Sequence, residues 1–139
     1  MEQKKMFCFQ CEQTANGVGC QGGGGICGKP APVAALQDEL TGALISLCTA
    51  CPSQPSAQTA RLIIEGLFTT ITNVDFNAQT VQQMKDKIHA EEQAVAGKVL
   101  PDYDVSQIWQ ANEDIRSLKS LILFGLRGMA AYADRKSVV

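Results

Sequence analysis

Residues 6–30 read MFCFQCEQTANGVGCQGGGGICGKP and hold four of the six cysteines and seven of the twelve glycines of this 139-residue chain. The cysteines are Cys8, Cys11, Cys20 and Cys27, separated by two, eight and six residues. Two sulfurs in a CxxC pair can approach one metal centre from a single turn, and the two single cysteines can complete the ligand shell from the following loop. Glycine adopts positive φ freely and lets backbone N–H groups approach sulfur. The stretch therefore predicts a cysteine-ligated centre wrapped by flexible main chain.

Four thiolates at this spacing suit three kinds of site. Structural zinc sites typically pair one CxxC with a second CxxC or with two histidines. Cys20 and Cys27 do not form a second CxxC, and no pair of histidines follows. Disulfides rarely persist in the reducing cytosol. N–H···S contacts from a glycine-rich loop suit an iron–sulfur cluster, whose reduction potential they help to set. The spacing favours an iron–sulfur cluster over zinc and over disulfides, and it does not separate 2Fe–2S from 4Fe–4S.

The composition excludes several classes of protein. The chain is 45% apolar and 19% charged with a formal charge of −2, which is typical of a globular protein. It has no stripe of Lys and Arg, so we expect no nucleic-acid partner. No apolar run approaches the roughly 20 residues that span a bilayer, so we expect no membrane segment. The N-terminal residues lack the apolar stretch and cleavage site of a secretory signal, which indicates a cytoplasmic protein.

The rest of the chain carries helical periodicity. After Pro30 and Pro32, apolar residues recur every three or four positions, which predicts a first helix ending at about Cys51. Asp75 or Asn77 is the expected N-cap of a later helix. No strand pattern is convincing. The pattern predicts further helices over about 57–72, about 78–98 and from about 105 onward.

These elements predict an all-α fold, an antiparallel helical bundle preceded by a Gly-rich cysteine loop. We assign residues 1–30 to the cluster-binding loop and residues 31–133 to the bundle. The last six residues, 134–139, read DRKSVV. They equal the translation of a common sequencing-library adapter, GATCGGAAGAGCGTCGTGTAG, up to its stop codon. We therefore expect residues 134–139 to be an artefactual or non-native tail on a truncated reading frame.

Five other residues invite a functional interpretation, and a structural one is favoured for each. Cys48 and Cys51 form a second CxxC, but both lie at the end of an apolar-periodic helix, where buried cysteine serves as a small hydrophobe. His89 lies on a helix rich in polar residues, so we expect a solvated or boundary position. Trp109 and Tyr132 are expected to be packing anchors.

The chain resembles the hybrid cluster proteins, also called prismane proteins or hydroxylamine reductases. The resemblance rests on MFCFQCEQTANGVGC, GICGKP and VAALQDEL near the N-terminus and on NEDIRSLKSLILFGLRGMAAYAD later in the chain. It implies that Cys8, Cys11, Cys20 and Cys27 ligate the family's proximal cluster, a one-electron relay. The eight-residue gap is similar to that of members with a 4Fe–4S centre, so 4Fe–4S is favoured over 2Fe–2S. The last gap, QGGGGI, is one residue longer than in those members.

The resemblance also implies what this chain does not contain. In the family, hydroxylamine is reduced to ammonia and water, and nitric oxide is also reduced, at a second, hybrid 4Fe–2O–2S cluster. That cluster takes one His, two Glu and four cysteine sulfurs. This chain has one His and only two cysteines beyond the loop. We therefore expect an electron-transfer domain without catalytic residues, whose partners are a redox partner reductase and the family's catalytic domains.

Two other functions compete with this interpretation. One is a small zinc-stabilised helical interaction module without redox activity. The other is a freestanding ferredoxin-like carrier, which should be a stable monomer. A truncated domain, by contrast, should expose apolar helix faces and aggregate.

Overall fold

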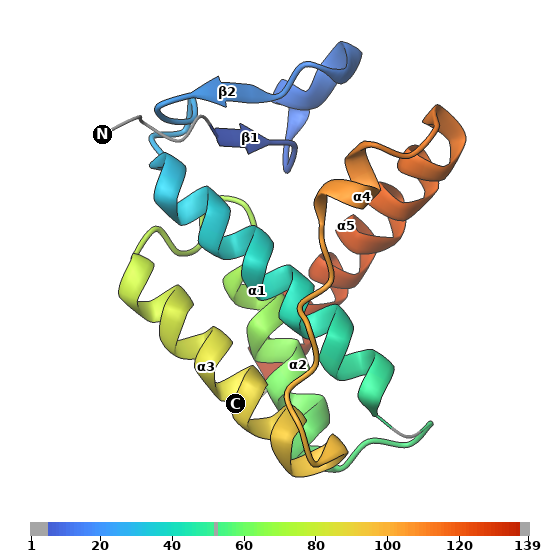
Figure 1. Cartoon of the computed structure of the whole chain (residues 1–139). Helices are drawn as coiled ribbons and strands as arrows, with labels where there is room; N and C mark the ends of the chain where they lie inside the picture. Colours follow the sequence, from blue (N-terminus) through green and yellow to red (C-terminus); the bar gives the residue numbers. More distant parts are fainter. Residues whose placement is uncertain (1–5, 52, 137–139) are drawn as a thin grey trace.

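The computed structural model describes residues 6–51 and 53–136, and Figure 1 shows that helices dominate this part of the chain. The predicted helical fold class is confirmed. The side chains of residues 134–136 and all of residues 137–139 lie outside the described part, so the expected non-native tail stays a prediction. The elements are β1 (Met6–Cys8), a 3-10 helix η1 (Glu12–Gly17), β2 (Cys20–Gly22), α1 (Ala31–Ala50), α2 (Ala57–Thr69), α3 (Ala78–Ala96), α4 (Ser106–Trp109) and α5 (Glu113–Lys136).

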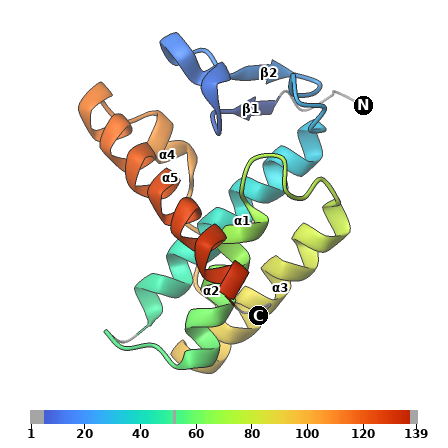
Figure 2. The same cartoon turned by 180° about the vertical axis from the view of Figure 1, so that it is seen from behind.

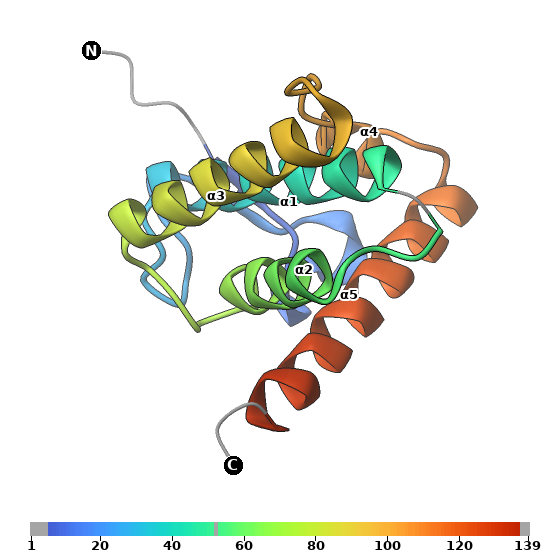
Figure 3. The same cartoon turned by 90° about the horizontal axis from the view of Figure 1, so that it is seen from below.

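The main core lies between α1, α2 and α3, and α2 runs opposite to the other two (Figure 1). Apolar side chains at helical spacing on α1 meet those on α3, as the periodicity predicts. Figure 3 shows α1 and α3 side by side with α2 against them. The fully or nearly fully buried residues of this core are Leu40, Ala43, Leu44, Leu47, Val81 and Ile88.

Helix α5 crosses the bundle at an angle and contacts it along one side (Figures 2 and 3). Its Arg127 guanidinium reaches inward and donates to Thr41 Oγ1 of α1 (3.1 Å) and to Thr70 Oγ1 after α2 (3.0 Å). Leu123 and Ala130 are buried. The opposite, apolar side of α5 faces outward: its exposed large side chains are Ile115, Leu118, Leu121, Ile122, Phe124, Leu126, Met129 and Tyr132.

The expectation of no strand is wrong at the cysteine loop. β1 and β2 pair antiparallel with Met6 opposite Gly22 and Cys8 opposite Cys20. Each strand has three residues, too few for a period-two pattern to be visible in the sequence. Met6 is buried and packs with Ala31 and Ala34, so the hairpin is fixed to the first turns of α1.

The predicted helix boundaries hold to within a few residues except at the last helix. The expected helix from about 105 onward is two helices, α4 and α5, separated by residues 110–112. Asn112 Oδ1 accepts from Ile115 N (3.0 Å) and so starts α5 as a side-chain cap that periodicity does not reveal. Asn77, not Asp75, caps α3, and its Oδ1 accepts from the backbone N–H groups of the first turn.

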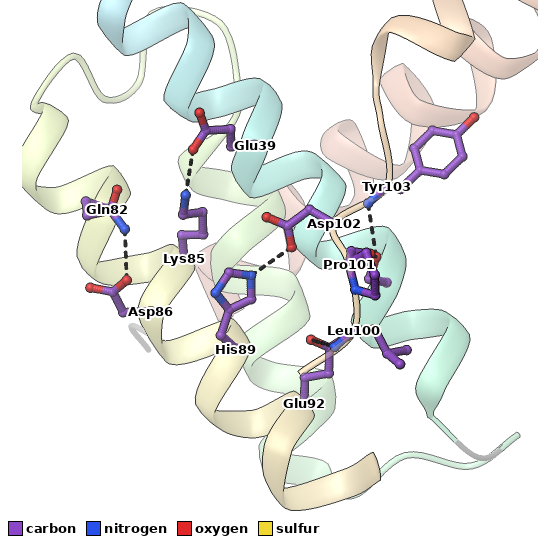
Figure 4. Close-up of polar contacts among 11 residues, drawn as sticks. Glu39, Gln82, Lys85, Asp86, His89, Glu92, Leu100, Pro101, Asp102 and Tyr103 are labelled. Atoms are coloured by element: carbon purple, nitrogen blue, oxygen red, sulfur yellow. Dashed lines mark hydrogen bonds and ion pairs between the residues drawn. The ribbon is translucent and has the colours of Figure 1, made fainter. Parts of the chain in front are cut away.

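The connection between α3 and α4 lies against α1 and α3 (Figure 4). It passes close to Gly42, where an added Cβ would lie 2.3 Å from Tyr103 O. His89 Nε2 and Asp102 Oδ1 are 2.7 Å apart, and His89 is half-buried, which confirms its expected boundary position (Figure 4). Within residues 6–51 and 53–136, no helix combines the length and apolar character needed to cross a membrane.

Candidate metal centre

The four predicted ligands line one cavity of about 190 Å³ at the hairpin end of the molecule. Cys8, Cys11 and Cys20 are half-buried and Cys27 is exposed, and all four thiols are free. The structure therefore brings together the four residues that the sequence singles out. The remaining lining residues are Met6, Gln10, Glu12, Gln13, Gly25, Ile26, Lys29, Thr72 and Asn73.

Strand pairing positions the first three cysteines. Cys8 ends β1 directly opposite Cys20, the first residue of β2. Cys11 follows β1 and precedes η1, and its carbonyl accepts from Thr14 N (2.9 Å). The return to β2 passes through Gly19 at φ +52°, where an added Cβ would lie 2.6 Å from Cys8 O. Only glycine fits this approach of the two chain segments without displacing backbone.

A tight glycine turn positions the fourth cysteine. Gly25 N donates to Lys29 O (2.8 Å), and Gly28 N donates to Gly25 O (2.9 Å). These two bonds close a loop around Cys27, and the chain then enters α1. The end of the glycine run therefore lies in a turn beside Cys27, and its role as the wrap of a cluster stays a prediction.

Two further contacts fix the CxxC segment to the helices. Thr72 Oγ1, beyond the end of α2, donates to Gln10 O (3.0 Å). The Trp109 ring of α4 lies 4.8 Å from the Phe7 ring and 5.1 Å from the Phe9 ring, measured between centroids. Trp109 is thus the packing anchor that the sequence predicts, and it holds α4 against the cysteine segment.

A buried lysine lies at this site, and sequence reasoning does not identify it. Lys29 is 1% exposed, and its Nζ donates to Gln10 Oε1 (2.9 Å) and Gln37 Oε1 (2.6 Å). Gln37 is fully buried and donates in turn to Asp75 O (2.8 Å). The Phe76 ring centroid lies 5.8 Å from Nζ. Lys29 belongs to the GICGKP block, but nothing in its pattern marks the side chain as buried.

Burial and nearby charges set the electrostatics of the hairpin end. Burial raises the pKa of the Cys8 thiol, while a backbone hydrogen bond at Gln10 and the charge of Lys29 act to lower it. Burial also raises the pKa of Asp38 to about 6, against the opposing charges of Arg127 and Lys29. Burial lowers the pKa of Arg127 to about 10, and the negative charge of Asp38 opposes this effect.

The donor set matches the chemistry of an iron–sulfur cluster. Four free thiols around one cavity are the ligands that such clusters take, and an adjacent ammonium complements their negative charge when ionised. In the described ranges, no three Cys, His, Asp or Glu side chains lie close enough together to hold a single metal ion. Ligation by Cys8, Cys11, Cys20 and Cys27 stays a prediction.

The structural interpretation of the other singled-out residues is correct in part. Cys51 packs against the main core as expected, and burial raises the pKa of its thiol. Cys48 is exposed, so its expected burial is wrong, because the last turn of α1 presents this position to solvent. Tyr132 is 76% exposed, so it is not a packing anchor among the described residues.

Comparison with known proteins identifies the family. The sequence profile of the Prismane/CO dehydrogenase family matches residues 6–139. Hydroxylamine reductases from Solidesulfovibrio magneticus and Maridesulfovibrio salexigens are 34% and 35% identical to this chain over 96% of its length. The hydroxylamine reductase of Desulfitobacterium hafniense strain Y51 is 39% identical over 93%. No solved structure matches the chain. The chain spans about 30% of the length of these relatives, and it belongs to the Prismane/CO dehydrogenase family.

Proposed function

We propose that this chain is the iron–sulfur electron-transfer domain of a hydroxylamine reductase. Cys8, Cys11, Cys20 and Cys27 would hold the cluster, which accepts and donates one electron when bound. The observation that carries the proposal is that four free thiols, spread over 20 positions of sequence, line one cavity. The curated relatives named hydroxylamine reductase support the parent activity.

We favour 4Fe–4S over 2Fe–2S as the type of cluster. The support is the eight-residue gap between Cys11 and Cys20, which is similar to that of family members with a 4Fe–4S centre. Eight residues are enough to connect Cys11 to Cys20 in the hairpin, because Gly19 lies directly against the Cys8 carbonyl.

The residues that line the cavity would form the protein environment of the cluster. Met6 and Gly25 line the cavity, and Met6 is buried. Phe9 and Trp109 cover the neighbouring segment. Burial, hydrogen bonds to sulfur and charge at the site are among the means by which a protein tunes the potential of such a cluster.

Reduction of hydroxylamine to ammonia and water would require further domains. We propose that these domains hold the hybrid 4Fe–2O–2S cluster and pack on the exposed apolar side of α5. The support is that the chain spans about 30% of the length of its relatives and that large apolar side chains such as Leu121 and Phe124 lie exposed. A reductase would supply the electrons, in the cytoplasm, where thiols stay reduced.

The test is the metal content of the anaerobically purified chain and its cysteine variants. We expect a brown protein with iron and acid-labile sulfide in cluster stoichiometry and a paramagnetic resonance signal after reduction. Serine at Cys8, Cys11, Cys20 or Cys27 should lower the iron content and the visible absorption.

Cys48→Ser and Cys51→Ser are matched controls, because they change the same side chain in the second CxxC, and they should keep the cluster. A colourless wild-type chain with one bound zinc would instead support the zinc-stabilised interaction module. Equal iron content in all six serine variants would refute the assignment of the ligands.

A further inference from the structure

The Lys29 ammonium is a buried charge whose direct partners are neutral. Its Nζ donates to the amide oxygens of Gln10 and Gln37, and both residues are uncharged. None of the ion pairs among the described residues includes Lys29. Buried lysines are rare unless paired, because removing an ammonium from water costs several kcal/mol. The metal-free chain thus holds a positive charge at the cysteine cavity that no direct contact neutralises, although the Asp38 carboxyl is near enough for the two charges to interact.

The contacts of Lys29 fix the position of this charge. Gln37 lies on α1 and is itself held by Asp75 O, so the acceptor cannot follow the ammonium toward solvent. Gln10 lies between Cys8 and Cys11, and its carbonyl accepts from Thr72 Oγ1. Helix α1, the CxxC segment and the turn before α3 therefore hold one ammonium beside the cavity that Lys29 shares with the four thiols.

We propose that Lys29 is a positioning residue whose fixed positive charge raises the reduction potential of the cysteine-held cluster. The proposal rests on the proposed function, since it needs a cluster in the cavity. A centre with four thiolate ligands carries net negative charge, and one-electron reduction makes it more negative. A fixed cation in a poorly solvated site stabilises the reduced state more than the oxidised state. Coulomb attraction at the site also offsets the cost of burying the ammonium.

Potentiometric titration of the reconstituted chain tests this proposal. Lys29→Gln removes the charge and keeps a hydrogen-bond donor, and Lys29→Met removes the charge with a side chain of similar length. Each should lower the equilibrium constant for one-electron reduction at least tenfold, which corresponds to a potential more negative by about 59 mV. Lys29→Arg keeps the charge and should stay close to the wild-type potential.

Lys98→Gln is the matched control, because Lys98 is exposed and follows the C-terminal end of α3. Figure 1 shows this end of α3 on the side of the bundle away from the hairpin. It should leave the potential unchanged. Loss of the cluster from both neutral variants, with an unchanged circular dichroism spectrum and retention by Lys29→Arg, also supports the role of the charge. An unchanged potential in the neutral variants, or an effect of Lys29→Arg equal to theirs, overturns it. A wild-type chain that never takes up iron and sulfide refutes the proposed function itself.

Discussion

Cys8 and Cys20 face each other across the antiparallel pair of β1 and β2, although 11 residues separate them in the chain. Facing residues in such a pair have Cα atoms about 4.5–5.5 Å apart. The same separation lies within the range that a disulfide spans, about 4.4–6.8 Å. The register that brings two candidate ligands together therefore also places them within the range of a disulfide.

We expect diamide treatment of the metal-free chain to join Cys8 to Cys20 and not to Cys11 or Cys27, because Cys20 lies directly opposite Cys8. The disulfide consumes two thiols of the cavity, so subsequent iron and sulfide uptake should fall to background and recover after reduction with dithiothreitol. Peptide mapping by mass spectrometry identifies the bond. In the control Cys20→Ser, Cys8 should stay largely unpaired at the same dose. A dominant Cys8–Cys11 bond in the wild type would contradict the hairpin register.

Alanine at Gly19 should weaken retention of the proposed cluster more than alanine at Gly17. Both glycines have positive φ, +52° and +72°, so alanine costs roughly 1–2 kcal/mol at either position. Only at Gly19 does the new Cβ meet backbone, at 2.6 Å from Cys8 O, whereas it meets nothing within 4 Å at Gly17. Iron retention during gel filtration and the rate of bleaching by a chelator measure the difference. Equal retention in the two variants would show that the hairpin can shift without loss of the site.

The long elements of this fold could be predicted from the sequence because apolar periodicity persists over many turns. Val81 and Ile88 of α3 repeat at helical spacing and meet α1 in the core. The hairpin could not be predicted, because three-residue strands carry no readable alternation. The division between α4 and α5 depends on one side-chain cap, Asn112, inside a stretch that otherwise favours helix.

The cysteines of the candidate site could be located from spacing alone, but their surroundings could not. Burial of Lys29 arises from Gln10, Gln37 and Phe76, which come from three separate segments. Exposure of Tyr132 has a similar cause, because an apolar helical face predicts burial without specifying the partner. Contacts of this kind, between segments that are distant in the sequence, cannot be predicted from the local pattern of residues.

Folding stability of the metal-free chain should fall as the pH rises through the pKa of Asp38. Burial raises that pKa from 3.8 to about 6, against the opposing charges of Arg127 and Lys29 and with a small contribution from Glu39. The folded state therefore holds the proton more tightly, so this stabilisation is complete below pH 3.8 and is lost as the pH rises through about 6. A shift of about two pKa units corresponds to about 3 kcal/mol. Urea unfolding between about pH 4 and pH 7 measures the slope.

Two variants test whether Asp38, and not a neighbouring group, causes this pH dependence of stability. Asp38→Asn should remove most of the slope and should be more stable than the wild type at neutral pH, because the amide needs no charge to be buried. Glu39→Gln removes the adjacent carboxylate, with its small contribution to the pKa of Asp38 and its ion pair with Lys85, and should keep most of the slope. The same slope in Asp38→Asn would mean that another group titrates in this window.

The 139-residue chain should self-associate through the outward side of α5. Leu121 and Phe124 are 67% and 68% exposed, and their neighbours on the helix are also apolar, so association removes this surface from water. Each large side chain buried in this way contributes about 1.5–3 kcal/mol, so Leu121→Glu with Phe124→Glu should weaken association more than tenfold. Light scattering during gel filtration over a range of concentrations measures the association.

Gln58→Glu with Gln83→Glu adds the same two charges at exposed positions on α2 and α3 and should leave association unchanged. A wild-type chain that is monomeric at all concentrations would favour a freestanding carrier over a domain that packs on further polypeptide.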